Sequence, residues 1–176
     1  MSWVYAIVGL VALQRLAELL YAQRNTQALL ARGAQEFGRS HYGLIVFLHA
    51  GWLIAIVLSI PRPASIAWSW MILFCLLQAI RIWIIASLGP FWTTRIVTLK
   101  DAPLVRRGPY RFMRHPNYLV VVLEIAVLPL VFREYGVAIV FSILNAGVLA
   151  WRIREEERAL APRRRSQGSL DGVTQP

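Results

Sequence analysis

The sequence predicts an all-α integral membrane protein with five transmembrane helices, in which the last two helices form a tight hairpin and a cytoplasmic C-terminal helix follows. Three observations predict this fold class. Apolar residues make up 57% of the 176 residues and charged residues only 16%, with a mean hydropathy of +0.53. The apolar residues form runs long enough to cross a bilayer core of about 30 Å. Lysine and arginine are concentrated in alternate connections between these runs, as in membrane proteins.

The first predicted span covers residues 3–22 and is interrupted by Gln14, Arg15 and Glu18. Arg15 and Glu18 are three residues apart, so a helix places them on one face, where they can form an ion pair. Ionisable residues at this depth face the bundle interior, either at a functional site or as a link to a neighbouring helix. Only two residues precede the span, without a basic segment, so we expect the span to be retained rather than cleaved as a signal peptide.

A polar connection is predicted over residues 23–40, either as a loop throughout or with a short surface helix, followed by a second span over 41–60 and a third over 66–88. Tryptophans at both ends of the third span are typical of the membrane interface. Arg81 is near enough to the end of this span to extend its guanidinium to that interface. The two histidines of the second span lack the i,i+4 spacing of paired helical metal ligands, and the chain has one cysteine. We therefore expect no metal site and no internal disulfide.

The last two predicted spans cover residues 117–132 and 135–153, and two residues separate them. So short a connection makes the two helices antiparallel neighbours. A polar helix is expected to continue from the last span to about residue 160. We therefore assign residues 1–160 to a single membrane domain, and expect the polar segment 161–176 to be a disordered tail.

The distribution of basic residues predicts the orientation in the membrane. Fifteen Lys and Arg residues lie in the segments 23–40, 89–116 and 152–176, whereas the connections at 61–65 and 133–134 contain one each. By the positive-inside rule the N-terminus is outside, and the 89–116 connection and the C-terminus are cytoplasmic. A net charge of +10 would suggest nucleic acid in a soluble protein. No stacking platform or reading helix accompanies this charge, so we expect no nucleic-acid partner.

Two polar motifs are predicted to meet on the cytoplasmic side. The first is Arg-Arg-Gly-Pro-Tyr-Arg-Phe-Met-Arg-His-Pro-Asn-Tyr, from Arg106 to Tyr118, where Pro116 has the position of a helix start. The second leaves the last span and carries Arg152 and Glu156 at i,i+4, on one helix face. Taken alone, the second pair could be a surface salt bridge, and the arginines of the first could contact lipid phosphates.

The combined pattern resembles a known family of membrane enzymes. Arg-x-Gly-Pro-Tyr-Arg-x-x-Arg-His-Pro-Asn-Tyr, an apolar span and then Arg-x-x-x-Glu-Glu-x-x-Leu are similar to the isoprenylcysteine carboxyl methyltransferase family, over about residues 87–160. Within that family the chain looks most like the small bacterial branch with five spans, some members of which methylate polyketide alkylpyrones. The resemblance implies a bacterial inner-membrane location and a lipophilic small-molecule or prenylated substrate, reached from the membrane lipid.

The resemblance also implies S-adenosyl-L-methionine as the methyl donor, held between the last two helices under the preceding loop. It assigns Arg152 to the substrate's acidic group, as the catalytic and substrate-binding residue, and we expect Glu124, in the middle of its span, to contribute to substrate binding. Family members from higher cells often have histidine at Ala102, so a side-chain contact is lost there. The residues expected to contact the cofactor are Ala102, Pro103, Leu104, Val105, Tyr110, His115, Pro116, Asn117, Tyr118 and Glu156.

Methyl transfer from a sulfonium to an anion is an in-line displacement, for which placement and exclusion of water supply most of the rate. A carboxylate or an acidic hydroxyl is ionised near neutral pH, and an adjacent arginine can orient it and keep it ionised. The absence of Gly-x-Gly-x-x-Gly after a strand excludes a Rossmann-type cofactor site.

Two other functions are compatible with parts of the sequence. One is an NADPH-dependent reductase of the steroid-reductase-like type, because such families also have His-Pro-Asn-Tyr before a late span. The Arg-x-x-x-Glu-Glu-x-x-Leu ending argues against this function. The other is a non-catalytic membrane subunit in which Arg15, Glu18, Arg81 and Glu124 line a polar path. A chain of five spans without repeat symmetry makes a transporter a poor interpretation.

Overall fold

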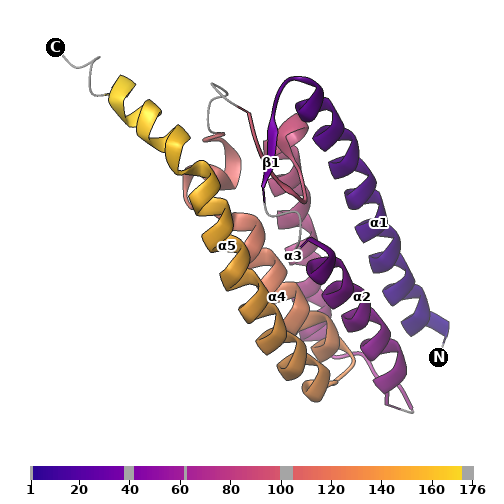
Figure 1. Ribbon diagram of the computed structural model, residues 1–176. Helices are drawn as coiled ribbons and strands as arrows, with labels where there is room; N and C mark the ends of the chain where they lie inside the picture. The colour runs from indigo at the N-terminus through magenta and orange to yellow at the C-terminus, as the bar shows by residue number, and fades with distance from the viewer. Residues whose placement is uncertain (1, 38–41, 62, 100–104, 172–176) are drawn as a thin grey trace.

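The computed structural model describes residues 2–37, 42–61, 63–99 and 105–171. Five long helices run roughly along one direction, and a small sheet and two short 3-10 helices lie near one end of them (Figure 1). The elements in chain order are α1 (Ser2–Ala31), β1 (Gln35–Phe37), α2 (Tyr42–Ser59), α3 (Trp68–Leu88), η2 (Gly89–Phe91), β2 (Ile96–Thr98), η3 (Gly108–Arg111), α4 (Pro116–Val131) and α5 (Tyr135–Asp171).

Four of the described helices, α1, α2, α3 and α5, are long and apolar enough to cross a membrane. The fifth, α4, is equally apolar but has only 16 residues. The protein therefore has four to five apolar helices able to span a membrane, as the sequence predicted in outline. The large apolar side chains on the outside of the bundle, such as Phe47, Leu58 and Ile143, are exposed to the extent expected of lipid-facing residues.

Two helices extend beyond the predicted spans. Helix α1 continues to Ala31 through residues predicted as a polar connection, and it ends in a Schellman motif around Gly33, whose φ is 86°. Here Ala34 N donates to Leu29 O and Gly33 N donates to Leu30 O, both at 3.0 Å. Helix α5 continues to Asp171, where the composition predicted a disordered tail. In α1 the bilayer thickness limits the apolar run but not the helix, because arginine, leucine and alanine favour helix in water as well.

The connection between α3 and α4 contains a strand that was not predicted. Strand β2 pairs antiparallel with β1, with Glu36 opposite Val97. Arg95, next to β2, forms a salt bridge of 3.0 Å with Glu36. Asn25 of α1 donates to the carbonyl oxygens of Gly89 and Trp92 at 3.1 and 2.9 Å. These contacts fix the connection against the end of α1.

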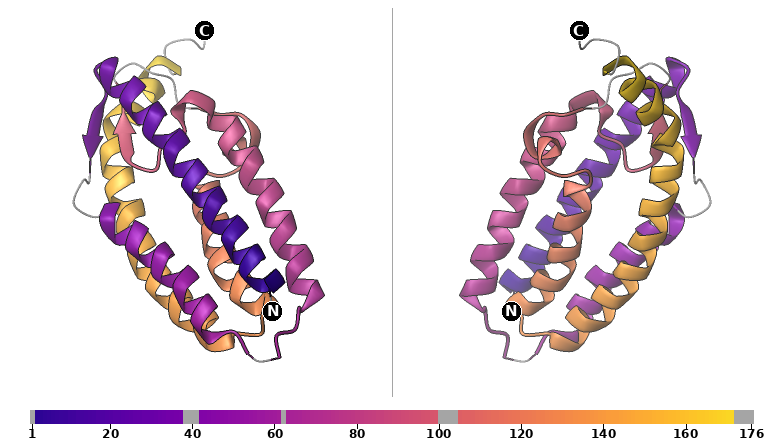
Figure 2. Two further views of the ribbon diagram at one scale, coloured as in Figure 1. Left: turned by 90° about the vertical axis from the view of Figure 1, so that its right-hand side faces the viewer. Right: turned by 90° about the vertical axis from the view of Figure 1, so that its left-hand side faces the viewer.

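Helix α4 is the most enclosed of the helices and lies between α3 and α5 (Figure 2). Its buried residues Ile125 and Leu128 pack with Val8 of α1 and Trp52 of α2 in the main apolar core. Trp52 Nε1 donates to Ile125 O at 3.1 Å, which satisfies the one polar atom of that buried ring. This core occupies the half of the bundle near the N-terminus, remote from the strands.

A buried cluster of ion pairs joins α1, α3 and α4 near the middle of the bundle. Arg15 pairs with Glu18 at 3.1 Å, which confirms the contact predicted from their spacing. Arg15 and Arg81 both pair with Glu124, at 2.8 and 2.9 Å, and Arg81 also pairs with Glu18 at 2.7 Å. The expectation that Arg81 reaches the interface was therefore wrong. Its partners lie on two other helices, and Arg81 is only 6% exposed.

Candidate active site

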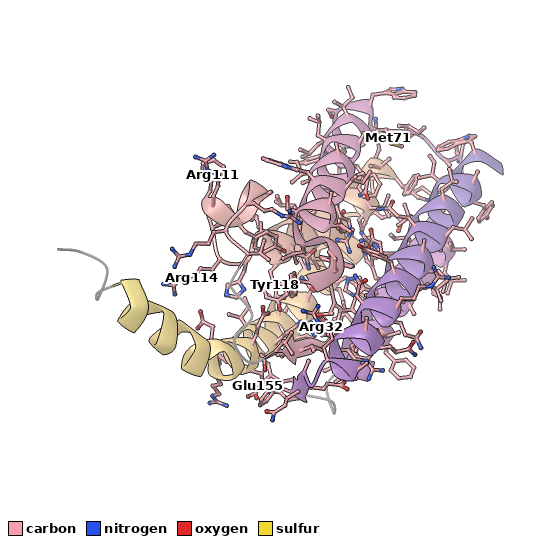
Figure 3. The ribbon with its side chains drawn as sticks, turned by 90° about the horizontal axis from the view of Figure 1, so that it is seen from above. Arg32, Met71, Arg111, Arg114, Tyr118 and Glu155 are labelled. Carbon is pink, nitrogen blue, oxygen red and sulfur yellow. The ribbon has the colours of Figure 1, made fainter. Side chains whose placement is uncertain are left out.

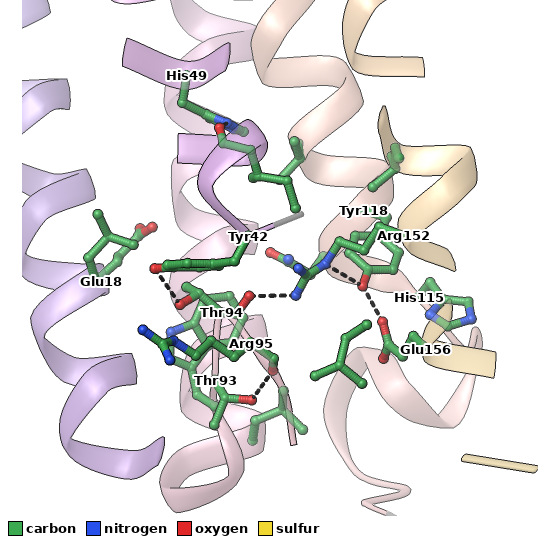
Figure 4. Close-up of a pocket in the computed structure, with 18 of the residues that line it drawn as sticks. Glu18, Tyr42, His49, Thr93, Thr94, Arg95, His115, Tyr118, Arg152 and Glu156 are labelled. Atoms are coloured by element: carbon green, nitrogen blue, oxygen red, sulfur yellow. Dashed lines mark hydrogen bonds between the residues drawn. The ribbon is translucent and has the colours of Figure 1, made fainter. Parts of the chain in front are cut away.

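A cavity of about 760 Å³ runs through the half of the protein that carries the strands. Its walls come from α1, α2, α3 and α5, from the segment around β2, and from the start of α4 (Figure 4). Polar side chains line one end, near the strands, and apolar side chains of α2 and α5 line the middle. The volume is within the range of sites for drug-sized ligands and cofactors.

The motif from Arg106 to Tyr118 contains the start of helix α4, as the sequence predicted. His115 is the N-cap of α4, and Pro116 occupies the first helical position, where its missing N–H costs nothing. Further upstream, Gly108 has φ of 56° and packs so closely on Ser87 that a Cβ would overlap that side chain. Arg107 Nε donates to Ser87 O at 2.6 Å. The glycine and the arginine thus hold η3 against the end of α3 and set the direction in which Tyr110 points.

The two motifs meet at Tyr118. Arg152 Nε donates to the Tyr118 hydroxyl at 3.0 Å, and that hydroxyl donates to Glu156 Oε2. Arg152 Nη2 donates to the carbonyl oxygen of Thr94 at 2.5 Å (Figure 4). Tyr118 therefore bridges Arg152 and Glu156, for which a direct salt bridge was the alternative left open by their spacing. The bridge holds both charged groups at the wall of the cavity.

The structure brings most of the predicted site residues to one cavity. Pro116 is buried at the start of α4 and does not line the cavity. Glu124 is 1% exposed and lies in the ion-pair cluster, apart from the other predicted residues. Ala102, Pro103 and Leu104 lie outside the described residues. The predicted residues that line the cavity are Val105, Tyr110, His115, Asn117, Tyr118, Arg152 and Glu156.

Three buried polar atoms of cavity-lining residues at this end have no hydrogen-bond partner within the described ranges, namely Trp92 Nε1, Asn117 Oδ1 and His115 Nε2. The His115 ring is stacked on Tyr118, with 5.3 Å between ring centroids, and its Nε2 lies 3.6 Å from Glu157 Oε1. Burial raises the pKa of the Tyr110 phenol, and the nearby Glu156 carboxylate raises it further. Tyr110 therefore stays protonated at neutral pH and can donate a hydrogen bond.

Several residues of the cavity wall were not identified from the sequence. Tyr42, at the start of α2, contacts the Thr94 hydroxyl with its own hydroxyl at 3.2 Å, and the Arg95 guanidinium lies 5.0 Å from the centre of the Tyr42 ring. The β-branched run that forms β2 was the only local signal for this wall. Its pairing with β1 depends on a strand that lies about sixty residues earlier, outside any local pattern.

Seen from this end, the outer rim carries several arginines, and Arg111 points away from the helices (Figure 3). No group of three or more His, Cys, Asp or Glu side chains among the described residues could hold a metal ion. The polar end of the cavity presents arginine, tyrosine and carboxylate groups, which suit an organic ligand that carries charges and hydroxyls.

Comparison with known proteins identifies the family. The model of the isoprenylcysteine carboxyl methyltransferase family matches residues 70–162. The uncharacterized protein YpbQ of Bacillus subtilis is 40% identical over 164 residues, which cover 91% of this chain and 96% of that protein. An uncharacterized protein of Haemophilus influenzae is 26% identical over 155 residues, covering 84% and 88%. No solved structure matches the chain. The matched region contains both motifs and the Tyr118 bridge, and the chain belongs to the isoprenylcysteine carboxyl methyltransferase family.

Proposed function

We propose that the protein is a membrane O-methyltransferase that uses S-adenosyl-L-methionine to methylate a carboxylate or an acidic hydroxyl on a lipophilic substrate. The observation that carries this proposal is the Tyr118 bridge, which places Arg152 and Glu156 side by side on the wall of one cavity. Family membership supports methyl transfer as the reaction type.

The residues at the polar end fit S-adenosyl-L-methionine. The cofactor has hydroxyls, an amino-acid group and a base, and its bound sulfonium supplies an electrophilic methyl group. Glu156 can accept hydrogen bonds from an ammonium or from hydroxyls, and Asn117 Oδ1 and His115 Nε2, which make no hydrogen bond within the described residues, offer further contacts. Tyr110, kept protonated by burial, is a donor. A polar ligand would satisfy buried atoms that are otherwise costly to leave without partners.

Arg152 has the geometry to orient the methyl acceptor. Its Nε and Nη2 are engaged by Tyr118 and Thr94, while Nη1 has no partner in the part of the chain that the structure describes. The guanidinium is thus held in a fixed plane with one nitrogen available toward the cavity. A carboxylate or enolate bound there would stay ionised, and its oxygen would need no separate base to attack a methyl group.

The apolar middle of the cavity suits the hydrophobic part of a membrane-soluble substrate, whether a prenylated or an alkylated one. We further propose five spans, with the basic end of the bundle in the cytoplasm and the N-terminus outside, because α4 is predominantly apolar, with its one charged residue, Glu124, buried in ion pairs, and the arginines gather at one end. A reporter fused after Pro176 should then be cytoplasmic, and one fused before Trp3 external. Finding both on one side would contradict the five-span topology.

The first test is cofactor binding in detergent. S-adenosylhomocysteine, the product of methyl transfer, should raise the melting temperature of the purified protein, since a ligand that binds only the folded state stabilises it. NADPH at the same concentration is the control and should leave the melting temperature unchanged. Stabilisation by NADPH alone would contradict the methyltransferase proposal and favour the reductase alternative.

A further inference from the structure

The cavity extends beyond the groups that the proposed reaction uses. About two helical turns further into the bundle, it is lined by His49 of α2 and Asn145 of α5. The ion-paired residues Arg15, Glu18 and Arg81 line the same cavity. This inner group of side chains is separate from the Tyr118 bridge.

His49 and Asn145 lie at the same depth. Tyr42 and Arg152 both contact Thr94, so these two side chains define an outer layer of the cavity. Helices α2 and α5, which carry them, pack side by side and run in opposite directions (Figure 1). His49 follows Tyr42 by seven residues, and Asn145 precedes Arg152 by seven. Seven helical residues rise about 10 Å, so the inner layer lies about 10 Å from the outer one. Between them the cavity is apolar, with Ile45, Val46, Val148 and Leu149 on its walls.

Each of these two side chains has an unused polar atom. Asn145 is 4% exposed, and its Nδ2 has no hydrogen-bond partner among the described residues. The Ile45 carbonyl oxygen lies 2.9 Å from His49 Nδ1, so Nδ1 is the donor in the neutral ring and Nε2 is left as an acceptor. No described residue bonds to that Nε2. A buried amide without a partner is destabilising, so a ligand group that bonds to it recovers the missing hydrogen bond.

The ion-paired residues offer little to a ligand. The guanidinium of Arg81 donates to Glu18 and Glu124 through all three nitrogens. Two arginines and two glutamates also leave the cluster formally neutral, so it does not call for a charged ligand. The inner group therefore leaves two donors, Asn145 Nδ2 and Arg15 Nε, and one acceptor, His49 Nε2, without a partner among the described residues. A hydroxyl is the smallest uncharged group that can both accept from Asn145 and donate to His49.

We propose that His49 and Asn145 form an inner subsite that binds a hydroxyl on the lipophilic substrate, about 10 Å from the group that is methylated. This inference rests on the proposed function for the position of the methylated group. It deepens that function by assigning the substrate a second polar group, separated from the first by an apolar segment.

The probes are medium-chain fatty acids with a terminal hydroxyl, in a series of increasing length, together with the unsubstituted acids and the terminal methyl ethers. Binding is measured in detergent with S-adenosylhomocysteine present. At the matching length the hydroxy acid should bind about tenfold more tightly than the unsubstituted acid, as expected for two neutral hydrogen bonds. The methyl ether accepts but cannot donate, so its affinity should lie between the two.

Asn145→Leu and His49→Phe should each remove most of the preference for the hydroxyl. Leu144→Met, at an exposed position next to Asn145, is the matched control and should keep it. Asn145→Leu should also melt at the same temperature as the wild type or higher, because it removes an unpartnered amide. That outcome shows that a lost preference does not reflect misfolding.

A wild-type protein that binds hydroxy and unsubstituted acids equally at every length overturns the inner subsite. A preference that survives in both Asn145→Leu and His49→Phe overturns it as well. The proposed function fails separately, if S-adenosylhomocysteine does not stabilise the protein. A hydroxyl preference that depends on His49 and Asn145 would still support the inner subsite in that case.

Discussion

Replacing Glu156 by glutamine isolates the contribution of its charge to cofactor binding. Glutamine has nearly the same shape, and its carbonyl oxygen can still accept the hydrogen bond from Tyr118, so the bridge to Arg152 should remain. What is lost is a charged acceptor for an ammonium or a hydroxyl of the cofactor. Hydrogen bonds to charged groups contribute about 1.5–3 kcal/mol, and we take the lower value because Glu156 is only half-buried.

A loss of about 1.5 kcal/mol weakens binding about tenfold. With S-adenosylhomocysteine at about 100 times its wild-type Kd, the wild-type protein gains about 2.7 kcal/mol of stability. At the same concentration the variant would be at about 10 times its own Kd, and the gain falls to about 1.4 kcal/mol. The ligand-induced rise in melting temperature should therefore fall by about half, while the melting temperature without ligand changes little.

Glu155→Gln is the matched control for this measurement. Glu155 is the adjacent carboxylate on α5, and it pairs at 2.8 Å with Arg158, an exposed residue of the same helix. Its substitution removes the same charge from the same helix without touching the Tyr118 bridge, so the ligand-induced shift should be that of the wild type. An unchanged shift in Glu156→Gln, or an equal loss in Glu155→Gln, would refute the assignment of Glu156 to the cofactor.

Three further substitutions test other parts of the structure. Arg152→Lys should keep S-adenosylhomocysteine affinity but lose about 10- to 100-fold in the rate of single-turnover methyl transfer. The reason is that lysine cannot bond to Tyr118 and Thr94 and still contact the methyl acceptor, and a normal turnover rate would contradict this role. Gly108→Ala should lower the free energy of unfolding by about 1–3 kcal/mol, because φ at this position is 56° and an added Cβ would overlap Ser87. An unchanged melting temperature would be inconsistent with that packing. Burial raises the pKa of Glu134 from 4.5 to about 7, so the folded state keeps a proton that the unfolded state releases. The stability of the wild type relative to Glu134→Gln should therefore fall as the pH rises from 4.5 to about 7, and parallel melting curves across this range would contradict it.

Contacts within one helix could be predicted from the sequence, and contacts between helices could not. The Arg15–Glu18 pair follows from a spacing of three residues, and the start of α4 follows from Pro116. The partners of Arg81 do not follow from any local spacing, because they depend on how α1 and α4 are placed around α3. The same holds for Glu124, whose position among arginines of two other helices separates it from the rest of the predicted site.

The candidate site likewise has one part that could be predicted from the sequence and one part that depends on how the helices pack. Its seven predicted cavity residues are in or next to motifs that the sequence displays directly. The wall formed by Tyr42 and Thr94, and the inner pair of His49 and Asn145, come together only because α2 and α5 run side by side in opposite directions. A single histidine or asparagine in an apolar run is an isolated polar residue until the facing helix is known.

The ion-pair cluster constrains the order in which the chain can enter the membrane. A charged side chain at the centre of a helix raises the cost of inserting that helix by about 2.5–3.5 kcal/mol. Helix α1 carries both members of its first ion pair, Arg15 and Glu18, so the charges in its apolar part cancel and it can enter the bilayer as soon as it is synthesised. Helix α4 has Glu124 without a basic residue of its own and is the shortest of the apolar helices. We expect α4 to insert stably only after α1 and α3 have placed Arg15 and Arg81 in the membrane, which makes the first helix a prerequisite for assembling the part of the chain that carries the family motifs.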